Sequence, residues 1–304
     1  MTAVSSIPGL SGTTVEKARR ARRLGSLRKS HVVGTRWWSS TLLTIVAWLV
    51  GIAFFFPVFW MVLTAFKPEA SAYTYPPQIT FHPTLSEFAQ VFSSGMGPYF
   101  EHSGIATVLS TVFVLVLATP AAYALSVRPV RRWQDSLFFF ISTKMLPIVA
   151  AIVPLYIIAK DTGLLDTVWA LVILYTAMNL PIAVWMLRSF LLEVPKEVLE
   201  AARIDGASLV QELRRVVAPM IAPGLAATAL ICVIFAWNEF FFAVNLTSTQ
   251  ASTVPVFLVS FITARGLFWA KLSAAATVAS VPVIIVGWIA QKQLVRGLSM
   301  GAIK

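Results

Sequence analysis

The stretch EVLEAARIDGASLVQELRRVVAP, from Glu197 to Pro219, is a compact charged segment that lies between two long apolar runs. Four acidic residues and three arginines fall between Glu197 and Arg215. In the whole chain of 304 residues only 12% are charged and 58% are hydrophobic, whereas a soluble domain has about 25% charged residues. The composition therefore indicates an integral membrane protein, and the charged interruption requires an explanation.

Six apolar segments are long enough to cross a membrane, which takes about 20 helical residues. They are residues 39–66, 103–126, 137–159, 167–189, 217–243 and 272–295. The runs are continuous rather than alternating, which excludes a β-barrel. Prolines lie inside several of them, and neighbouring helices of a membrane bundle can satisfy the backbone groups that prolines leave free. We expect an all-α integral membrane protein with one six-helix domain at 39–295 and no internal repeat.

The position of the basic residues predicts the orientation of the chain, whose formal net charge is +11. With the N-terminus inside, nineteen Lys and Arg fall on the inner side and four on the outer side. Cytoplasmic loops of membrane proteins carry such an excess. We therefore expect both termini in the cytoplasm, as a basic tail at 1–38 and a short tail at 296–304. The loop at 190–216 is expected inside and the loop at 67–102 outside.

The charged segment has the local signals of two short helices joined by an elbow. Pro195 suits the first turn of a helix over 196–205, and Gly206 can adopt the left-handed conformation that ends it. Ser208 and Gln211 fit a capping box that opens a second helix. The first helix has a slim apolar set available for burial: Val198, Ala201, Ala202 and Ile204. A helix resting on lipid would be basic with bulky anchors, so the acids and alanines favour docking to a protein.

Polar residues inside the spans are candidates for the transport pathway, because such groups are costly at membrane depth. Lys144 either extends toward the membrane surface or faces the pathway, and Asn179 either caps the helix break at Pro181 or faces substrate. The cluster Trp237, Asn238 and Glu239 combines an aromatic face with an amide and a carboxylate, which suits a sugar. We expect no catalytic group and no metal site.

The spacing of the charged segment resembles that of a known family. Glu200, Ala201 and Ala202, then Gly206, then Val216 to Pro219 match the EAA signature of the transmembrane subunits of bacterial ABC importers. Further stretches are similar to carbohydrate permeases of the maltose-transporter type: TAFKPEA, PAAYALS, KMLPIVAAIVPLY, FAWNEFFFAV and the terminal GLSMGAIK. The resemblance covers about residues 40 to 304. Ser299 and Met300 depart from the usual terminal pattern, which leaves a contact of the C-terminal tail with the ATPase open.

The resemblance implies the type I ABC importer permease fold, in which a cytoplasmic coupling helix docks on a separate ATPase. Its docking residues would be Glu200, Ala201, Ala202, Asp205 and Gly206. The implied partners are a second homologous permease, two ATPase copies and an extracytoplasmic solute-binding protein, in a bacterial plasma membrane. The chain has no P-loop sequence and is therefore not expected to be an enzyme. ATP and Mg would bind to the partner, and no cofactor to this chain.

The solute is left open between several classes. STKMLP, DTGLLDT and YTAMNLPI look most similar to sugar-alcohol permeases for sorbitol or mannitol. Alternatives of the same class are importers of glycerol 3-phosphate or of oligosaccharides. A secondary transporter driven by an ion gradient would show inverted repeats and buried ion-binding acids, so the single peripheral Glu239 argues against it.

Overall fold

The computed structural model describes residues 37–128, 130–263 and 266–301, and the side chains of 40–128, 130–263 and 266–291. It consists of two units, Met1–Pro57 and Val58–Lys304. The described part of the first unit belongs to α2 (Trp37–Ala65), whose side chains from Ser40 to Pro57 are all exposed. Residues 1–36 of the expected N-terminal tail at 1–38 lie outside the described residues.

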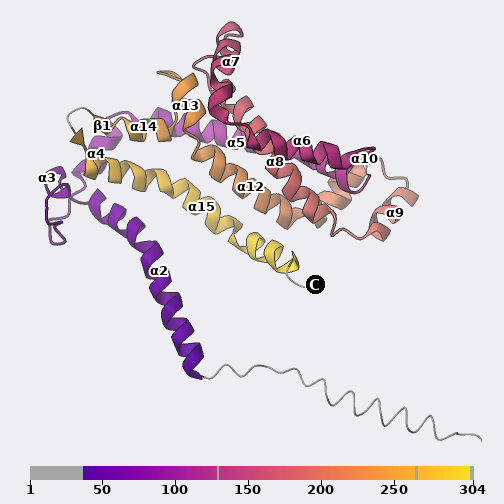
Figure 1. Cartoon of the computed structure of the whole chain (residues 1–304), viewed down its shortest axis with the longest axis horizontal. Coiled ribbons are helices and arrows are strands. Elements are labelled where there is room, and N and C mark those ends of the chain that lie inside the picture. The colour runs from indigo at the N-terminus through magenta and orange to yellow at the C-terminus, as the bar shows by residue number, and fades with distance from the viewer. Residues whose placement is uncertain (1–36, 129, 264–265, 302–304) are drawn as a thin grey trace, which may run out of the picture. The chain divides into compact units, whose positions relative to one another are not determined.

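The second unit is a bundle built on four helices, α5 (Met96–Ser126), α8 (Val168–Leu191), α12 (Ala222–Trp237) and α15 (Trp269–Gly301). α5 packs along α8, and α12 contacts α5, α8 and α15 (Figure 1). The packed faces contain many small residues, such as the buried Ala106, Ala118 and Ala122 of α5. Small side chains let helix backbones approach closely in a membrane, where packing rather than water exclusion drives association.

Shorter elements connect these helices. They are α3 (Glu69–Ala72), α4 (Ser86–Ser93), α6 (Trp133–Met145), α7 (Ile148–Asp161), α9 (Lys196–Ile204), α10 (Leu209–Gln211), the π-helical η1 (Glu212–Val217), α11 (Ala218–Met220), α13 (Phe241–Leu246) and α14 (Val254–Val259). The strands β1 (Ile262–Thr263) and β2 (Gly266–Leu267) pair antiparallel. The expected outer loop at 67–102 therefore contains α3, α4 and the first turns of α5. α15 continues through residue 301, so most of the expected tail at 296–304 is helical.

Four described helices are long and apolar enough to span a membrane: Ser40–Ala65, Met96–Ser126, Val168–Leu191 and Trp269–Gln291. Two further spans are possible as bent pairs, α6 with α7 and α10–α11 with α12, which bend by 90° and 83°. These six segments correspond to the six expected spans, and the all-helical membrane architecture is confirmed. The third and fifth are not the continuous helices that their hydropathy suggested.

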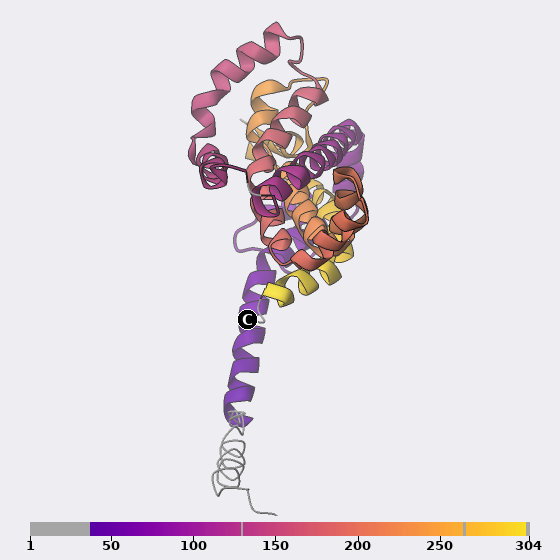
Figure 2. The same ribbon diagram turned by 90° about the vertical axis from the view of Figure 1, so that its right-hand side faces the viewer.

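Proline chemistry explains the two breaks. Leu146 has an extended backbone (ψ 129°), the conformation that a following proline imposes on its neighbour. Pro147 then precedes the first residue of α7, and α7 turns away from α6 (Figures 1 and 2). In the fifth segment Pro223 occupies the first turn of α12, where its missing N–H costs nothing. α12 then ends at Trp237, before α13 starts.

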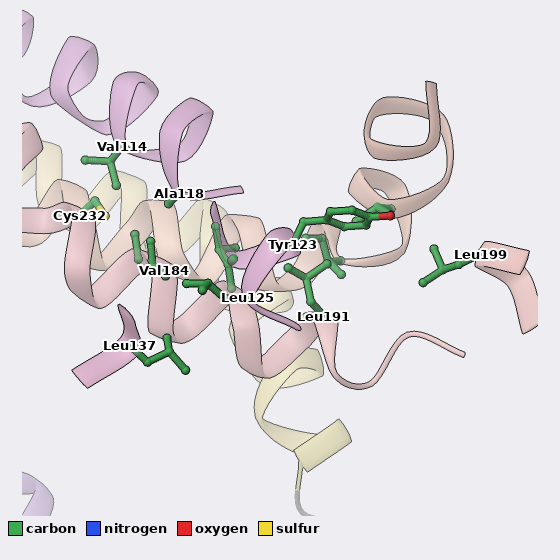
Figure 3. Packing of buried hydrophobic residues seen from close by; sticks show 14 residues of the cluster. Val114, Ala118, Tyr123, Leu125, Leu137, Val184, Leu191, Leu199 and Cys232 are labelled. Carbon is green, nitrogen blue, oxygen red and sulfur yellow. The ribbon is translucent and has the colours of Figure 1, made fainter. Parts of the chain in front are cut away.

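The buried cluster shown in Figure 3 joins the bundle to the charged segment. It contains Val114 and Ala118 of α5, Val184 of α8 and Cys232 of α12. At one end it includes Tyr123 of α5 and Leu199 of α9. The ring of Tyr123 extends from α5 toward the side on which Leu199 lies (Figure 3). The same hydrophobic core thus packs the spans and holds the short helix α9.

Two carboxylates hold connecting segments in place, one against a helix and one against another connecting segment. Glu69, in the TAFKPEA stretch, accepts hydrogen bonds from the backbone N–H groups of Ala270 (3.3 Å) and Lys271 (3.2 Å) in the first turn of α15. Asp166, between α7 and α8, accepts from the four backbone N–H groups of residues 248–251. Burial raises the pKa of the Asp166 carboxyl, but these amides outweigh it and the pKa lies below the usual value.

Candidate functional site

The charged segment folds as the two capped helices that its sequence predicts. α9 covers Lys196–Ile204 and ends before Gly206, which has a positive φ of 79°. Ser208 caps the following helix: its side chain accepts from the N–H of Gln211 (3.4 Å), whose side chain accepts from the N–H of Ser208 (2.8 Å). The capping box is therefore confirmed. Pro195 lies one position before the first helical residue, so it is the N-cap rather than part of the first turn.

α9 has one face turned to the protein and one turned outward. Leu199 is buried in the core cluster, and Arg203 points inward. On the outward side Glu200, Ala201, Asp205 and Gly206 are exposed, and Ala202 is half-buried. Ile204 is 85% exposed, which is unusual for a large apolar residue beside acids. The structure thus presents the predicted docking residues together on an accessible apolar and acidic surface.

Two hollows lie on either side of α9. One, of about 390 Å³, is lined by Ala202, Asp205, Gly206 and residues of the following helices, including Arg215 and Val216. The other, of about 260 Å³, lies between α9 and the ends of α5 and α8, and Glu200 and Lys196 reach its rim. The elbow is therefore surrounded by concave surface that a partner side chain could enter.

Glu212, the first residue of η1, is fully buried and anchors a polar cluster that the sequence motifs did not predict. Its carboxylate accepts hydrogen bonds from the Tyr123 hydroxyl, from Arg203 (3.0 and 3.3 Å) and from Arg128 (3.3 Å). The hydrogen bonds of Arg203 to Glu212 and to the Tyr123 hydroxyl raise the pKa of its guanidinium. One signal was present in the sequence: Glu212 interrupts the apolar positions Leu209, Leu213 and Val216 at helical spacing.

The candidate pathway residues do not converge on one site. Lys144 lies in the last turn of α6 and donates to the carbonyl of Met178 in α8 (2.8 Å), next to Asn179. Asn179 is fully buried, and among the described residues neither polar atom of its side chain has a hydrogen-bond partner. Pro181 deprives the carbonyl of Ala177, rather than Asn179, of its helical donor. Lys144 of α6 therefore lies close to Asn179 of α8.

Trp237, Asn238 and Glu239 lie at the end of α12, but their side chains contact different parts of the structure. The indole N–H of Trp237 donates to the carbonyl of Ala279 in α15 (3.1 Å). Asn238 is exposed and donates to the carbonyl of Ile234 one turn earlier (2.8 Å). Glu239 is buried and accepts from the backbone N–H groups of Phe242 (2.9 Å) and Ala243 (3.3 Å), so it caps α13. Each side chain is turned to a different neighbour, and Asn238 is the accessible one.

Among the described residues no three His, Cys, Asp or Glu side chains form a group that could hold a metal ion.

The fold resembles that of a solved membrane protein, in the crystal structure of a bacterial ABC transporter involved in the import of the acidic polysaccharide alginate. The TM-score is 0.67 at 22% sequence identity, over 95% of this chain and all of that chain.

Curated relatives match most of this chain. A probable ABC transporter permease protein, y4oR of Sinorhizobium fredii, is 38% identical over 86% of this chain and 95% of its own length. The diacetylchitobiose uptake system permease protein DasC of Streptomyces coelicolor is 33% identical over 86% and 95%. The trehalose/maltose transport system permease protein MalG of Thermococcus litoralis is 33% identical over 86% and 96%.

Residues 115–300 match the family model described as binding-protein-dependent transport system inner membrane component. This region contains the charged segment from Glu197 to Pro219 and four of the six candidate spans. The chain belongs to this family: it is a multi-pass inner-membrane permease subunit of an ABC transporter, without an ATPase domain of its own.

Proposed function

We propose that this chain forms half of the translocation pathway of an ATP-driven sugar importer and receives its driving force through α9. The observation that carries the proposal is the outward face of α9, where Glu200, Ala201 and Asp205 surround an exposed Ile204. An exposed apolar group among acids, beside concave surface, is typical of a protein contact. A basic cleft of a separate ATPase would be complementary to this face in charge.

In this assembly Glu200 pairs with a basic residue of the ATPase, and Gly206, which has no side chain, permits close approach at the elbow. Two ATPase copies bind ATP and Mg, and their closure moves the spans. A second homologous permease completes the pathway, and an extracytoplasmic binding protein delivers the solute. Both termini and α9 face the cytoplasm, as the excess of basic residues supports.

The solute class rests on the relatives and on the polar residues of the bundle. Two relatives at 33% identity are named for uptake of diacetylchitobiose and of trehalose or maltose. We propose a sugar or sugar alcohol as the solute, with sorbitol and mannitol as the first candidates. Glycerol 3-phosphate and oligosaccharides are the alternatives, and the two named relatives favour the oligosaccharides. Lys144, Asn179, Trp237, Asn238 and Glu239 remain the proposed pathway residues. Of the last three, Asn238 is the one accessible in this conformation.

The test is uptake by the complete complex in proteoliposomes, with ATP inside and binding protein outside. Radiolabelled sorbitol, mannitol, trehalose, maltose, diacetylchitobiose and glycerol 3-phosphate form the panel. Glu200→Ala should reduce uptake and ATP hydrolysis stimulated by the binding protein by about tenfold or more, since a hydrogen-bonded charge at an interface is lost. Glu193→Ala is the matched control, because Glu193 is an exposed acid just before α9 whose side chain makes no hydrogen bond or ion pair with the described residues.

The outcomes separate the alternatives. Accumulation of a panel solute that needs ATP and the binding protein supports the importer. Uptake that proceeds without the ATPase, or that follows an imposed ion gradient, would show a secondary transporter instead. Full activity in Glu200→Ala would remove α9 as the docking element.

A further inference from the structure

The Glu212 cluster connects three parts of the chain that are far apart in the sequence. Glu212 belongs to η1, Arg203 to α9, and Tyr123 to α5. Arg203 contacts both others, since one guanidinium nitrogen lies 3.0 Å from the carboxylate of Glu212 and 3.0 Å from the hydroxyl of Tyr123. We name these three residues with Arg128 the Glu212 latch.

Because Glu212 is buried, its carboxylate depends on the partners that the latch provides. A buried carboxylate is tolerated only when charged and hydrogen-bonding partners replace its lost water. Glu212 is fully buried, and both of its oxygens are satisfied by the two arginines and the tyrosine. Moving α9 away from α5 would separate Arg203 from Tyr123 and leave the carboxylate underbonded. The geometry therefore opposes independent movement of α9.

The apolar packing between α9 and the ends of α5 and α8 is incomplete, so the polar contacts of the latch contribute to holding α9 in place. A cavity of about 260 Å³ separates α9 from the ends of α5 and α8, and its lining includes Leu199 and Arg203 on one side and Ser126 and Leu191 on the other. Leu199 is the buried residue of α9. Across this hollow, α9 contacts the end of α5 through Leu199 and through the polar contacts of the Glu212 latch.

The π-helical turn places Glu212 in the latch. η1 covers Glu212–Val217, and both of these end residues are buried. A π-helical turn contains an extra residue relative to an α-helix and often occurs at functional sites. The wider turn lets the segment direct Glu212 toward α5 and α9 while Val217 packs in the core cluster with Tyr123. This arrangement combines a polar contact and apolar packing on one short element.

We propose that Glu212 is a positioning residue for energy coupling: it fastens α9 to the end of α5, so that displacement of α9 by the ATPase moves α5 with it. This inference rests on the proposed function, because it needs a partner that displaces α9. Glu212 itself touches neither the solute nor the ATPase. Tyr123 and Arg203 complete the fastening, and the half-exposed Arg128 donates a further hydrogen bond to the carboxylate.

The first experiment measures whether α9 and α5 move together. In a Cys232→Ala background, spin labels are placed on Lys196→Cys at the start of α9 and on Arg131→Cys in the turn after α5, both exposed positions. The interlabel distance is measured in the complete complex without nucleotide and after trapping with MgATP and vanadate. With Glu212 present one narrow distance should persist in both states. Glu212→Gln should broaden it or make it differ between the states.

The second experiment measures solute transported per ATP hydrolysed, a ratio that a purely structural role would not change. The probe is whichever panel solute the unmodified complex accumulates. Glu212→Gln should lower the ratio by about tenfold, the effect of losing hydrogen bonds to a charged group. Tyr123→Phe should lower it less, because both arginines still hold the carboxylate. Glu193→Gln, the same chemical change at an exposed acid, should leave ratio and distances unchanged.

Each result decides the proposal. Unchanged distances in folded Glu212→Gln complexes would overturn the latch, as would an unchanged transport ratio. If the unmodified complex accumulates no panel solute, the proposed solute class fails, while the distance measurement still decides the latch. A Glu212→Gln complex that does not assemble is replaced by Tyr123→Phe, which leaves no buried charge unpaired and must then broaden the distance.

Discussion

Replacing Asp166 with asparagine should release the segment 248–251 from the connection between α7 and α8. The Asp166 carboxylate accepts from the N–H groups of Ser248 (2.7 Å), Thr249 (3.2 Å), Gln250 (3.2 and 3.3 Å) and Ala251 (3.2 Å). Asparagine keeps one acceptor oxygen but places an NH₂ donor where the second oxygen accepts. Two of the backbone N–H groups then meet a donor instead of an acceptor.

The magnitude follows from the bonds that are lost. Hydrogen bonds to a charged group contribute about 1.5–3 kcal/mol, and the lower end applies because Asp166 is half-buried and water screens it. A loss of about 1.5 kcal/mol raises the population of the open segment about tenfold. Asp166 has a positive φ of 56°, which asparagine also tolerates. The Asn variant therefore isolates the carboxylate, whereas Asp166→Ala adds about 1 kcal/mol of backbone strain.

Hydrogen exchange measured by mass spectrometry on the purified complex provides the assay. Amides of residues 248–251 should exchange about tenfold faster in Asp166→Asn, and faster again in Asp166→Ala. Asp161→Asn, an exposed acid at the end of α7, is the control for the charge change and should leave these amides as they are. Equal exchange in Asp166→Asn and the unmodified chain would refute the reasoning.

The stabilisation of residues 248–251 by Asp166 depends on pH in a direction that the pKa shift determines. The pKa of folded Asp166 is lowered from its ordinary 3.8, so the folded protein binds fewer protons there than the unfolded chain. The stabilisation is fully present above that ordinary value and is lost as the pH falls through the folded pKa. After correction for intrinsic rates, exchange at 248–251 should stay constant between about pH 5 and 8, and accelerate only in stronger acid.

Two further changes test the packing. A Cβ added at Gly224 would overlap the ring of Phe190, so Gly224→Ala should destabilise the complex by about 1–3 kcal/mol through overpacking. Gly104→Ala, where an added Cβ would have nothing within 4 Å, should be neutral or stabilising. Equal melting temperatures of the Gly224→Ala and Gly104→Ala complexes would contradict the close approach of Gly224 to Phe190. Glu69→Gln should weaken the cap of α15 by about 1 kcal/mol; unchanged hydrogen exchange at Ala270 would disprove this role.

The architecture of the charged segment was readable from the sequence because its signals are local. Gly206 adopts the expected positive φ, and Ser208 and Gln211 form the expected capping box. These features depend on side chains three residues apart or on one residue without a Cβ, so neighbours in the chain suffice to predict them. The expected groups on the outward face of α9 remain predictions of docking until a partner is tested.

Hydropathy predicted where the spans lie but not their shape. The third segment bends by 90° at Pro147, whereas Pro154 and Pro181 lie inside α7 and α8. A proline is compatible with either outcome, because neighbouring helices decide whether the freed backbone groups can be satisfied within a continuous helix. Similarly, Trp237, Asn238 and Glu239 are adjacent in the sequence, yet they turn to different neighbours.

The sequence was sufficient to predict the class of the protein, the positions of the apolar segments and the helix–elbow–helix of the charged segment, since apolar length and capping are properties of short stretches. The burial of Glu212, and the hydrogen bond that it accepts from Tyr123, 89 residues away along the chain, depend on the tertiary structure. The reason is physical: burial of a charge is decided by which groups the fold brings around it. No local pattern specifies a carboxylate's partners on α5 and α9.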